Sequence, residues 1–113
     1  MKMRIIMALC LLAPTLLAVF AAPAWAAIVT IVQAGQAFSQ TDVTLKAGDH
    51  LKFSNQDDVK HNILVQEGDD DDNAKDYGVQ PPGQSVDVAF DKAGKFLVRC
   101  HIHPDMKMNV IVQ

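Results

Sequence analysis

Apolar and polar residues alternate along most of the chain after residue 27, which is the pattern of half-buried β-strands. Val86, Val88 and Phe90 fall on one face of such a strand, and the polar or small residues between them fall on the other. Phe96 and Val98 repeat the pattern. No apolar run at helical spacing is long enough to predict a substantial helix, so the pattern indicates a mostly β fold.

Seven short strands are predicted, and residues typical of turns separate them. Their ranges are Ile28–Gln33, Asp42–Leu45, His50–Ser54, Asn62–Gln66, Ser85–Phe90, Gly94–Arg99 and Met108–Val112. Strands of this number and spacing predict an all-β sandwich of two antiparallel sheets packed face to face. The segment 67–83 is rich in Asp, Gly and Pro, so we expect it to loop across one edge of the sandwich.

The first 26 residues have the pattern of an export signal. Lys2 and Arg4 carry positive charge, the stretch from Ile5 to Phe20 is almost wholly apolar, and Ala24-Trp25-Ala26 is a small-x-small cleavage site. This predicts a signal peptide at residues 1–26, a mature domain at residues 27–113 and a periplasmic location.

An uncleaved membrane anchor is the alternative for this segment. The apolar stretch is short for a spanning helix, and Pro14 and Pro23 interrupt it, so we expect no stable membrane insertion after cleavage. Cys10 could indicate a lipid-modified cysteine, but Leu9 before it is too bulky for the usual cleavage pattern.

The chain of 113 residues, half of them apolar, has room for one compact domain.

The mature domain is acidic. Removing Lys2 and Arg4 leaves 8 basic side chains against 13 acidic ones, a formal charge of −5. This charge argues against a nucleic acid partner, whose phosphates need Lys and Arg.

A single cysteine, Cys100, remains after cleavage. Exported domains normally pair their thiols, so a lone thiol indicates another role. His103 and Met106 follow Cys100 at three-residue steps, close enough for one loop to fold these donors around a single ion. Thiolate, imidazole and thioether together match the demands of copper, and His61, after the turn at residues 57–60, is the candidate for the second imidazole.

These residues resemble a known family. His61-Asn62 before an apolar strand, with Cys100, His103 and Met106 near the C-terminus, is similar to the cupredoxins, and most of all to the amicyanin type. The resemblance implies a Greek-key β-sandwich with one copper ion bound by His61, Cys100, His103 and Met106. It also implies that Asn62 ties the two ligand segments together. The amino-acid sequence of residues 102–107 further resembles that of small periplasmic cupredoxins associated with methylamine utilisation.

Three other residues carry side chains that can bind metal, and the sequence indicates a different place for each. Met108 lies where a longer plastocyanin-type loop places its axial ligand, but the strand that follows would draw it into the sheet. His101 adjoins Cys100, and neighbouring side chains on extended backbone diverge, so we expect it to be solvated or to act through a ligand. His50 is expected to be a surface or edge residue. Taken alone, Cys100 could also be a core thiol.

A run of acidic residues at 69–72, with Glu67 and Asp76, is the other conspicuous feature. We interpret it as a solvated loop, with a docking surface for a basic redox partner as the alternative. Calcium binding is disfavoured, because Ala74 and Gln80 replace the turn glycine and the final glutamate of an EF-hand loop.

The sequence thus predicts a type 1 (blue) copper protein that shuttles single electrons and is not an enzyme. The resemblance implies transient redox partners, a donor dehydrogenase and an acceptor c-type cytochrome, and the chain is expected to be a monomer. The main rival is a copper chaperone or storage protein of the same fold, in which His101 and Met108 help to hold Cu(I). A zinc-binding or metal-free interaction domain is the third class.

Overall fold

The computed structural model describes residues 2–3, 8–19 and 25–113. It contains nine strands and one short 3-10 helix. The strands are β1 (Ile28–Ala34), β2 (Ala37–Phe38), β3 (Asp42–Leu45), β4 (Asp49–Asn55), β5 (His61–Glu67), β6 (Lys75–Gln80), β7 (Ser85–Phe90), β8 (Gly94–Arg99) and β9 (Lys107–Val112), and the helix is η1 (Asp71–Asn73). All seven predicted strands are present, with boundaries within one residue of those expected.

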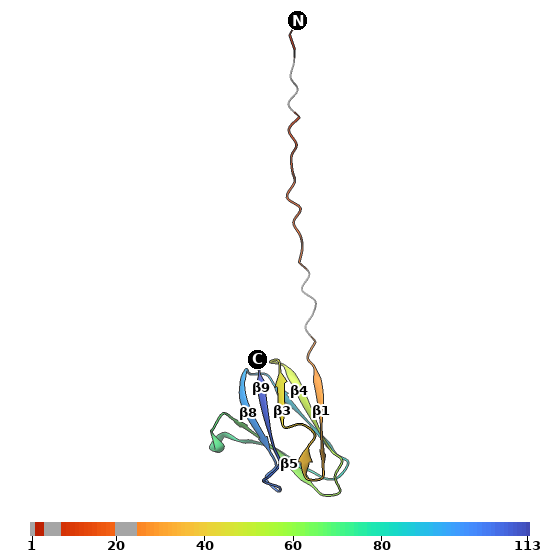
Figure 1. Cartoon of the computed structure of the whole chain (residues 1–113), viewed down its shortest axis with the longest axis vertical. Coiled ribbons are helices and arrows are strands. Elements are labelled where there is room, and N and C mark those ends of the chain that lie inside the picture. Colours follow the sequence, from red (N-terminus) through yellow and green to blue (C-terminus); the bar gives the residue numbers. More distant parts are fainter. Residues whose placement is uncertain (1, 4–7, 20–24) are drawn as a thin grey trace.

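The strands form two sheets that pack as a sandwich (Figure 1). One sheet has the order β2-β1-β4-β7 and the other the order β3-β9-β8-β5-β6. The all-β two-sheet prediction is therefore confirmed. The expectation that both sheets are purely antiparallel is wrong, because β1 pairs with β4 and β3 pairs with β9 in parallel.

Residues 67–83 are not the irregular loop that their composition predicted. Their second half forms β6, which pairs antiparallel with β5 at the edge of the larger sheet. Most of its side chains are exposed, so β6 has no alternation of buried residues for a sequence pattern to reveal. Backbone pairing with β5, rather than burial, makes this segment a strand.

A tight turn joins β1 to β2, which the sequence pattern also missed. Gly35 and Gln36 both have positive φ, 59° and 53°, as the two central residues of a hairpin turn of this hand require. The turn holds the backbone N–H of Gln36 2.8 Å from a carboxylate oxygen of Asp57. It therefore connects the smaller sheet to the segment that precedes β5.

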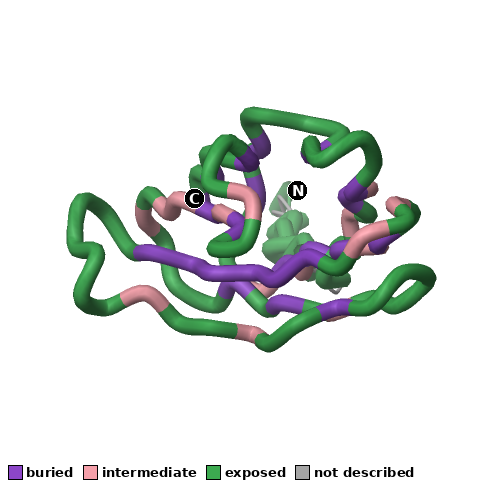
Figure 2. The backbone as a smooth tube through the Cα atoms, turned by 90° about the horizontal axis from the view of Figure 1, so that it is seen from below, coloured by how far each residue is buried: buried purple, intermediate pink, exposed green. Residues whose placement is uncertain are grey.

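The core lies between the inner faces of the two sheets. Figure 2 shows the buried stretches inside the body and the connecting loops exposed at its margin. The fully buried apolar side chains come from both sheets and include Ile31, Leu51, Phe53, Ile63, Val88, Val98 and Val110. Cys100, Met106 and Met108 belong to the same cluster, so the segment after β8 is packed against the core rather than free in solvent.

The chain before β1 leaves the sandwich at one end, and the loop between β8 and β9 lies at the other end (Figure 1). Arg4, Ala24 and part of the apolar stretch of the predicted signal peptide lie outside the described residues. Within the residues that are described, no helix is long and apolar enough to cross a membrane.

Candidate metal centre

The candidate ligands come from two segments at one end of the sandwich. His61 is the first residue of β5, and the other three candidates lie on the loop that joins β8 to β9. Two backbone hydrogen bonds close this loop, from Met106 N–H to the His103 carbonyl at 3.0 Å and from Cys100 N–H to the Met106 carbonyl at 3.2 Å. The loop is therefore a compact turn that begins and ends at candidate ligands.

The structure brings Cys100 and His61 together although 39 positions separate them in the sequence. The Cys100 sulfur lies 3.9 Å from Nδ1 of His61, and both side chains are buried. The ring of His103 is next to that of His61, with the ring centres 4.9 Å apart. Two imidazoles and a thiol thus share one small region of the protein.

The hydrogen-bond partner of His61 determines which ring nitrogen is free. Nε2 of His61 lies 3.0 Å from a carboxylate oxygen of Asp57. The backbone N–H of Gln36, followed by the hydrogen bond from His61, lowers the pKa of Asp57 to about 2. An ionised carboxylate can only accept, so Nε2 carries the proton and Nδ1 of a neutral His61 presents its lone pair toward Cys100.

Asp57 is itself held in place by Asn55, the last residue of β4. The buried side chain of Asn55 donates to the Val59 carbonyl at 2.9 Å and to the Gln80 carbonyl at 3.0 Å, and it accepts from Asp57 N–H at 3.0 Å. It therefore fixes the turn between β4 and β5 that carries Asp57. Neither residue could be assigned to the metal centre from the sequence, where the one signal was an acid four positions before His61.

Asn62 links the two ligand segments, as the resemblance implied. Its side-chain oxygen accepts from the backbone N–H of His101 at 2.7 Å and lies 3.4 Å from the Cys100 sulfur. The backbone N–H of Asn62 points at the same sulfur, also at 3.4 Å. The amide group holds the loop to β5, and the N–H can stabilise negative charge on sulfur.

The two methionines occupy different local settings. Met106 is at the end of the ligand loop, whereas Met108 lies within β9, where it is paired with Val98 of β8. Both side chains are buried in the core. Their positions agree with the expectation that Met108 belongs to the sheet.

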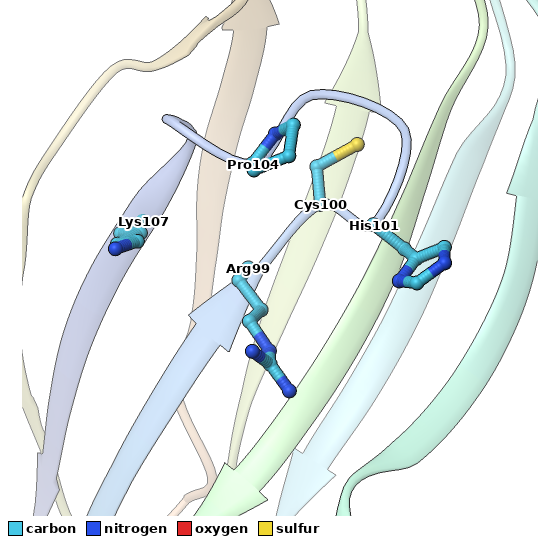
Figure 3. A pocket seen from close by; sticks show the side chains of 5 residues that line it. All are labelled: Arg99, Cys100, His101, Pro104 and Lys107. Carbon is cyan, nitrogen blue, oxygen red and sulfur yellow. The ribbon is translucent and has the colours of Figure 1, made fainter. Parts of the chain in front are cut away.

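His101 is turned away from the region that Cys100 faces. Figure 3 shows the two consecutive side chains extending in different directions. They line a pocket of about 210 Å³ together with Arg99, Pro104 and Lys107. His50 lies near the start of β4, away from the end that leads to His61, and is partly exposed, with Nδ1 3.1 Å from a carboxylate oxygen of Asp87.

The donors are neighbours, but they do not form a closed metal cage. No group of three or more His, Cys, Asp or Glu side chains among residues 2–3, 8–19 and 25–113 is arranged to hold a metal ion. The donor chemistry nevertheless fits copper. Cys100 forms no disulfide, Nδ1 of His61 has only the Cys100 sulfur as a partner, at 3.9 Å, and Nε2 of His103 is buried without a hydrogen-bond partner. These groups would hold the ion.

The solved structures that share this fold include those of copper proteins. A Cu(I) form of an amicyanin variant superimposes with a TM-score of 0.68 at 21% identity, covering 75% of this chain and 81% of that one. A purple cupredoxin from Nitrosopumilus maritimus gives a TM-score of 0.65 at 18% identity, covering 75% of this chain and 99% of that one.

Two relatives by sequence are methylamine utilization proteins MauL. The protein from Methylophilus methylotrophus is 34% identical over 77 residues, which are 66% of this chain and 43% of that protein. The one from Methylorubrum extorquens is 33% identical over 63 residues, which are 56% of this chain and 54% of that protein. The chain therefore spans about half the length of these relatives.

The family model for copper binding proteins of the plastocyanin/azurin family matches residues 26–113, which is the whole sandwich. The match covers both segments that carry the candidate ligands. The chain therefore belongs to the plastocyanin/azurin family of copper binding proteins, the cupredoxins, and it shares the fold of amicyanin.

Proposed function

We propose that this cupredoxin is a type 1 copper protein that passes single electrons between periplasmic redox partners, with His61, Cys100, His103 and Met106 as its ligands. The observation that carries the proposal is the approach of the Cys100 sulfur to Nδ1 of His61 at 3.9 Å, while Asp57 occupies the other nitrogen of the same ring. Residues 1–26 are proposed to be removed on export, leaving residues 27–113 as the mature domain.

Each ligand has a distinct role in the proposal. Copper supplies a one-electron couple between Cu(II) and Cu(I). Cys100 would provide the thiolate, and His61 and His103 would provide the two imidazoles. Met106 would provide a weakly bound thioether that helps to set the reduction potential.

The surrounding protein keeps these groups in place during electron transfer. Asp57 fixes the tautomer and orientation of the His61 ring, and Asn62 fastens the Cys100 loop to β5. Because the donors sit on the ends of β5 and β8 and on a loop packed into the core, little rearrangement accompanies a change of charge on the metal. A site that rearranges little between the two oxidation states suits an electron carrier.

His103 is the proposed exit for the electron. It is partly exposed on the loop, and its neighbours Ile102 and Pro104 are exposed apolar residues at the same end of the molecule. A small apolar surface suits a partner that docks briefly and leaves. The acidic residues of 69–72 are exposed and offer a complementary surface to a basic partner.

The names of the relatives suggest a setting for this chemistry. The two relatives by sequence are called methylamine utilization proteins, and amicyanin has the same fold as this chain. By analogy, we propose a dehydrogenase as electron donor and a c-type cytochrome as acceptor.

Loading the purified mature domain with Cu(II) tests the proposal. One equivalent of copper is expected to give an intense blue colour that a reductant removes and an oxidant restores. Cys100→Ser should abolish the colour, whereas His50→Ala, which removes an imidazole far from the site, should leave it intact. A colourless protein that retains only Cu(I) would instead assign the chain to copper handling.

A further inference from the structure

A second polar site lies at the opposite end of the sandwich from the candidate metal centre. Asp49 begins β4, and its side chain is 8% exposed. One carboxylate oxygen accepts the backbone N–H of Ala27 at 2.9 Å, and the other accepts the backbone N–H of Lys46 at 2.8 Å. The candidate ligands do not touch this site.

The carboxylate of Asp49 is ionised, and its cationic neighbours Lys46 and His50 act on it without forming an ion pair. The backbone N–H of Ala27, followed by that of Lys46, lowers the pKa of Asp49 below its ordinary value. Within the part of the chain that the structure describes, no Lys, Arg or His side chain forms an ion pair with Asp49. A carboxylate with so little access to water is costly unless a positive charge lies close to it.

Ala27 is the residue that would become the N-terminus of the mature chain. Its carbonyl accepts the backbone N–H of His50 at 2.9 Å, and its own N–H donates to Asp49. Both backbone groups of Ala27 are therefore bonded to β4. Before cleavage the nitrogen that faces Asp49 is a neutral amide. Cleavage after Ala26 would turn that same nitrogen into an ammonium group at the spacing of a charge-assisted hydrogen bond.

We infer that Asp49 is a binding site for the α-ammonium group of the mature chain, formed when the leader is removed. The inference rests on the proposed removal of residues 1–26. A pocket of about 280 Å³ beside Asp49 is lined by Trp25 of the leader together with Ala27 and Lys46, so the leader's departure leaves space for a hydrated ammonium group.

The ion pair has a structural consequence for the smaller sheet. Ala27 immediately precedes β1, which pairs in parallel with β4 from Ile28 opposite His50 onward. β1 has only the two-residue β2 as its other neighbour. Fixing the new terminus to Asp49 therefore holds the start of β1 in register once the leader no longer extends it.

The pKa of the α-amino group is the direct measure of this pairing. An opposite charge at hydrogen-bond distance should raise it from its ordinary value near 8 to about 9 or higher. The other charged groups around the site act in both directions. Lys46 in the turn and any charge on His50 of β4 oppose the rise. Asp91, which follows the Phe90 that pairs with Asp49, favours it, while Asp87 lies against Nδ1 of His50.

The experiment follows the methyl resonance of Ala27 with pH in metal-free protein that begins at Ala27. A matched form beginning at Ala26 moves the ammonium group by one residue and keeps Asp49. Asp49→Asn removes the negative charge, and Asp91→Asn removes an equal charge from an exposed position nearby. The inference predicts a raised pKa in the Ala27 form and in Asp91→Asn, and a pKa near 8 for the α-amino groups of the other two.

A pKa near 8 for Ala27 in the unsubstituted protein would overturn the inference. If Asp49→Asn does not fold, the form beginning at Ala26 decides the question alone, because its carboxylate is intact. Mass spectrometry of the exported protein should find Ala27 as the first residue, and a different first residue would also contradict the inference. Neither result involves copper, so both are separate from the test of the proposed function.

Discussion

Replacing Asn62 with alanine should loosen the connection between the two ligand segments. The side-chain oxygen of Asn62 accepts the His101 N–H at 2.7 Å, and the substitution leaves that donor without a protein partner in a partly buried position. An unsatisfied donor of this kind costs about 2 kcal/mol. For a mature domain of 87 residues, this loss corresponds to a fall in Tm of roughly 8–16 °C.

The same substitution should weaken copper binding, because the metal must then order a loop that Asn62 had already positioned. Groups that orient metal ligands typically change affinity by roughly 10- to 100-fold. The reduction potential should change little, since the backbone N–H of residue 62 still points at the Cys100 sulfur.

Thermal unfolding of the metal-free protein and competition with a Cu(II) chelator measure the two effects. The matched control is Asn109→Ala, which removes an exposed amide hydrogen-bonded to Asp42 at 3.3 Å and should cost less than about 0.5 kcal/mol. If Asn62→Ala behaves like this control in both assays, the loop is not held by Asn62 and the reasoning is wrong.

Three further predictions concern other parts of the site and the fold. Met106→Leu should shift the reduction potential of the copper protein, whereas Met108→Leu should leave it unchanged. Each substitution should cost less than about 1.5 kcal/mol in stability. Voltammetry that shows equal shifts for the two variants would contradict the assignment of Met106 as the thioether ligand. Asn55→Ala removes three hydrogen bonds of a fully buried side chain and should lower the free energy of unfolding by about 3 kcal/mol, which chemical denaturation measures; a loss below about 1 kcal/mol would be inconsistent with it. Backbone N–H groups hold the pKa of Asp49 below its ordinary value and lower that of Asp57 to about 2. The stability that these carboxylates contribute is therefore present above pH 4 and is lost as pH falls toward 2. Circular dichroism should show a shallower acid transition in Asp57→Asn, and an unchanged transition would refute this origin.

The sequence pattern predicted those strands that bury alternate side chains. β7 and β8 are examples, because Val88 and Val98 fall on the core side while the residues next to them do not. The pattern could not reveal β6, whose residues are mostly exposed at a sheet edge, or β2, which is two residues long. Parallel pairing was also beyond it, since the side-chain pattern of a strand does not determine the direction of its partner.

The candidate site divides in a similar way. Cys100, His103 and Met106 share one short loop, so their spacing already indicated a common centre. The approach of His61 depends on the packing of β5 beside β8. The sequence could suggest it only from the place of His61 after a turn and from resemblance. The supporting roles of Asn55 and Asp57 arise from contacts with Gln80 and Gln36 in distant segments, which no local pattern records.

X-ray absorption at the copper edge of the Cu(II)-loaded mature domain is the most direct test of the shared coordination sphere. The account predicts one sulfur and two nitrogen neighbours close to the metal in the unsubstituted protein, loss of the close sulfur in Cys100→Ser and loss of one nitrogen in His61→Ala. A spectrum without a close sulfur, or one that His61→Ala leaves unchanged, would contradict it.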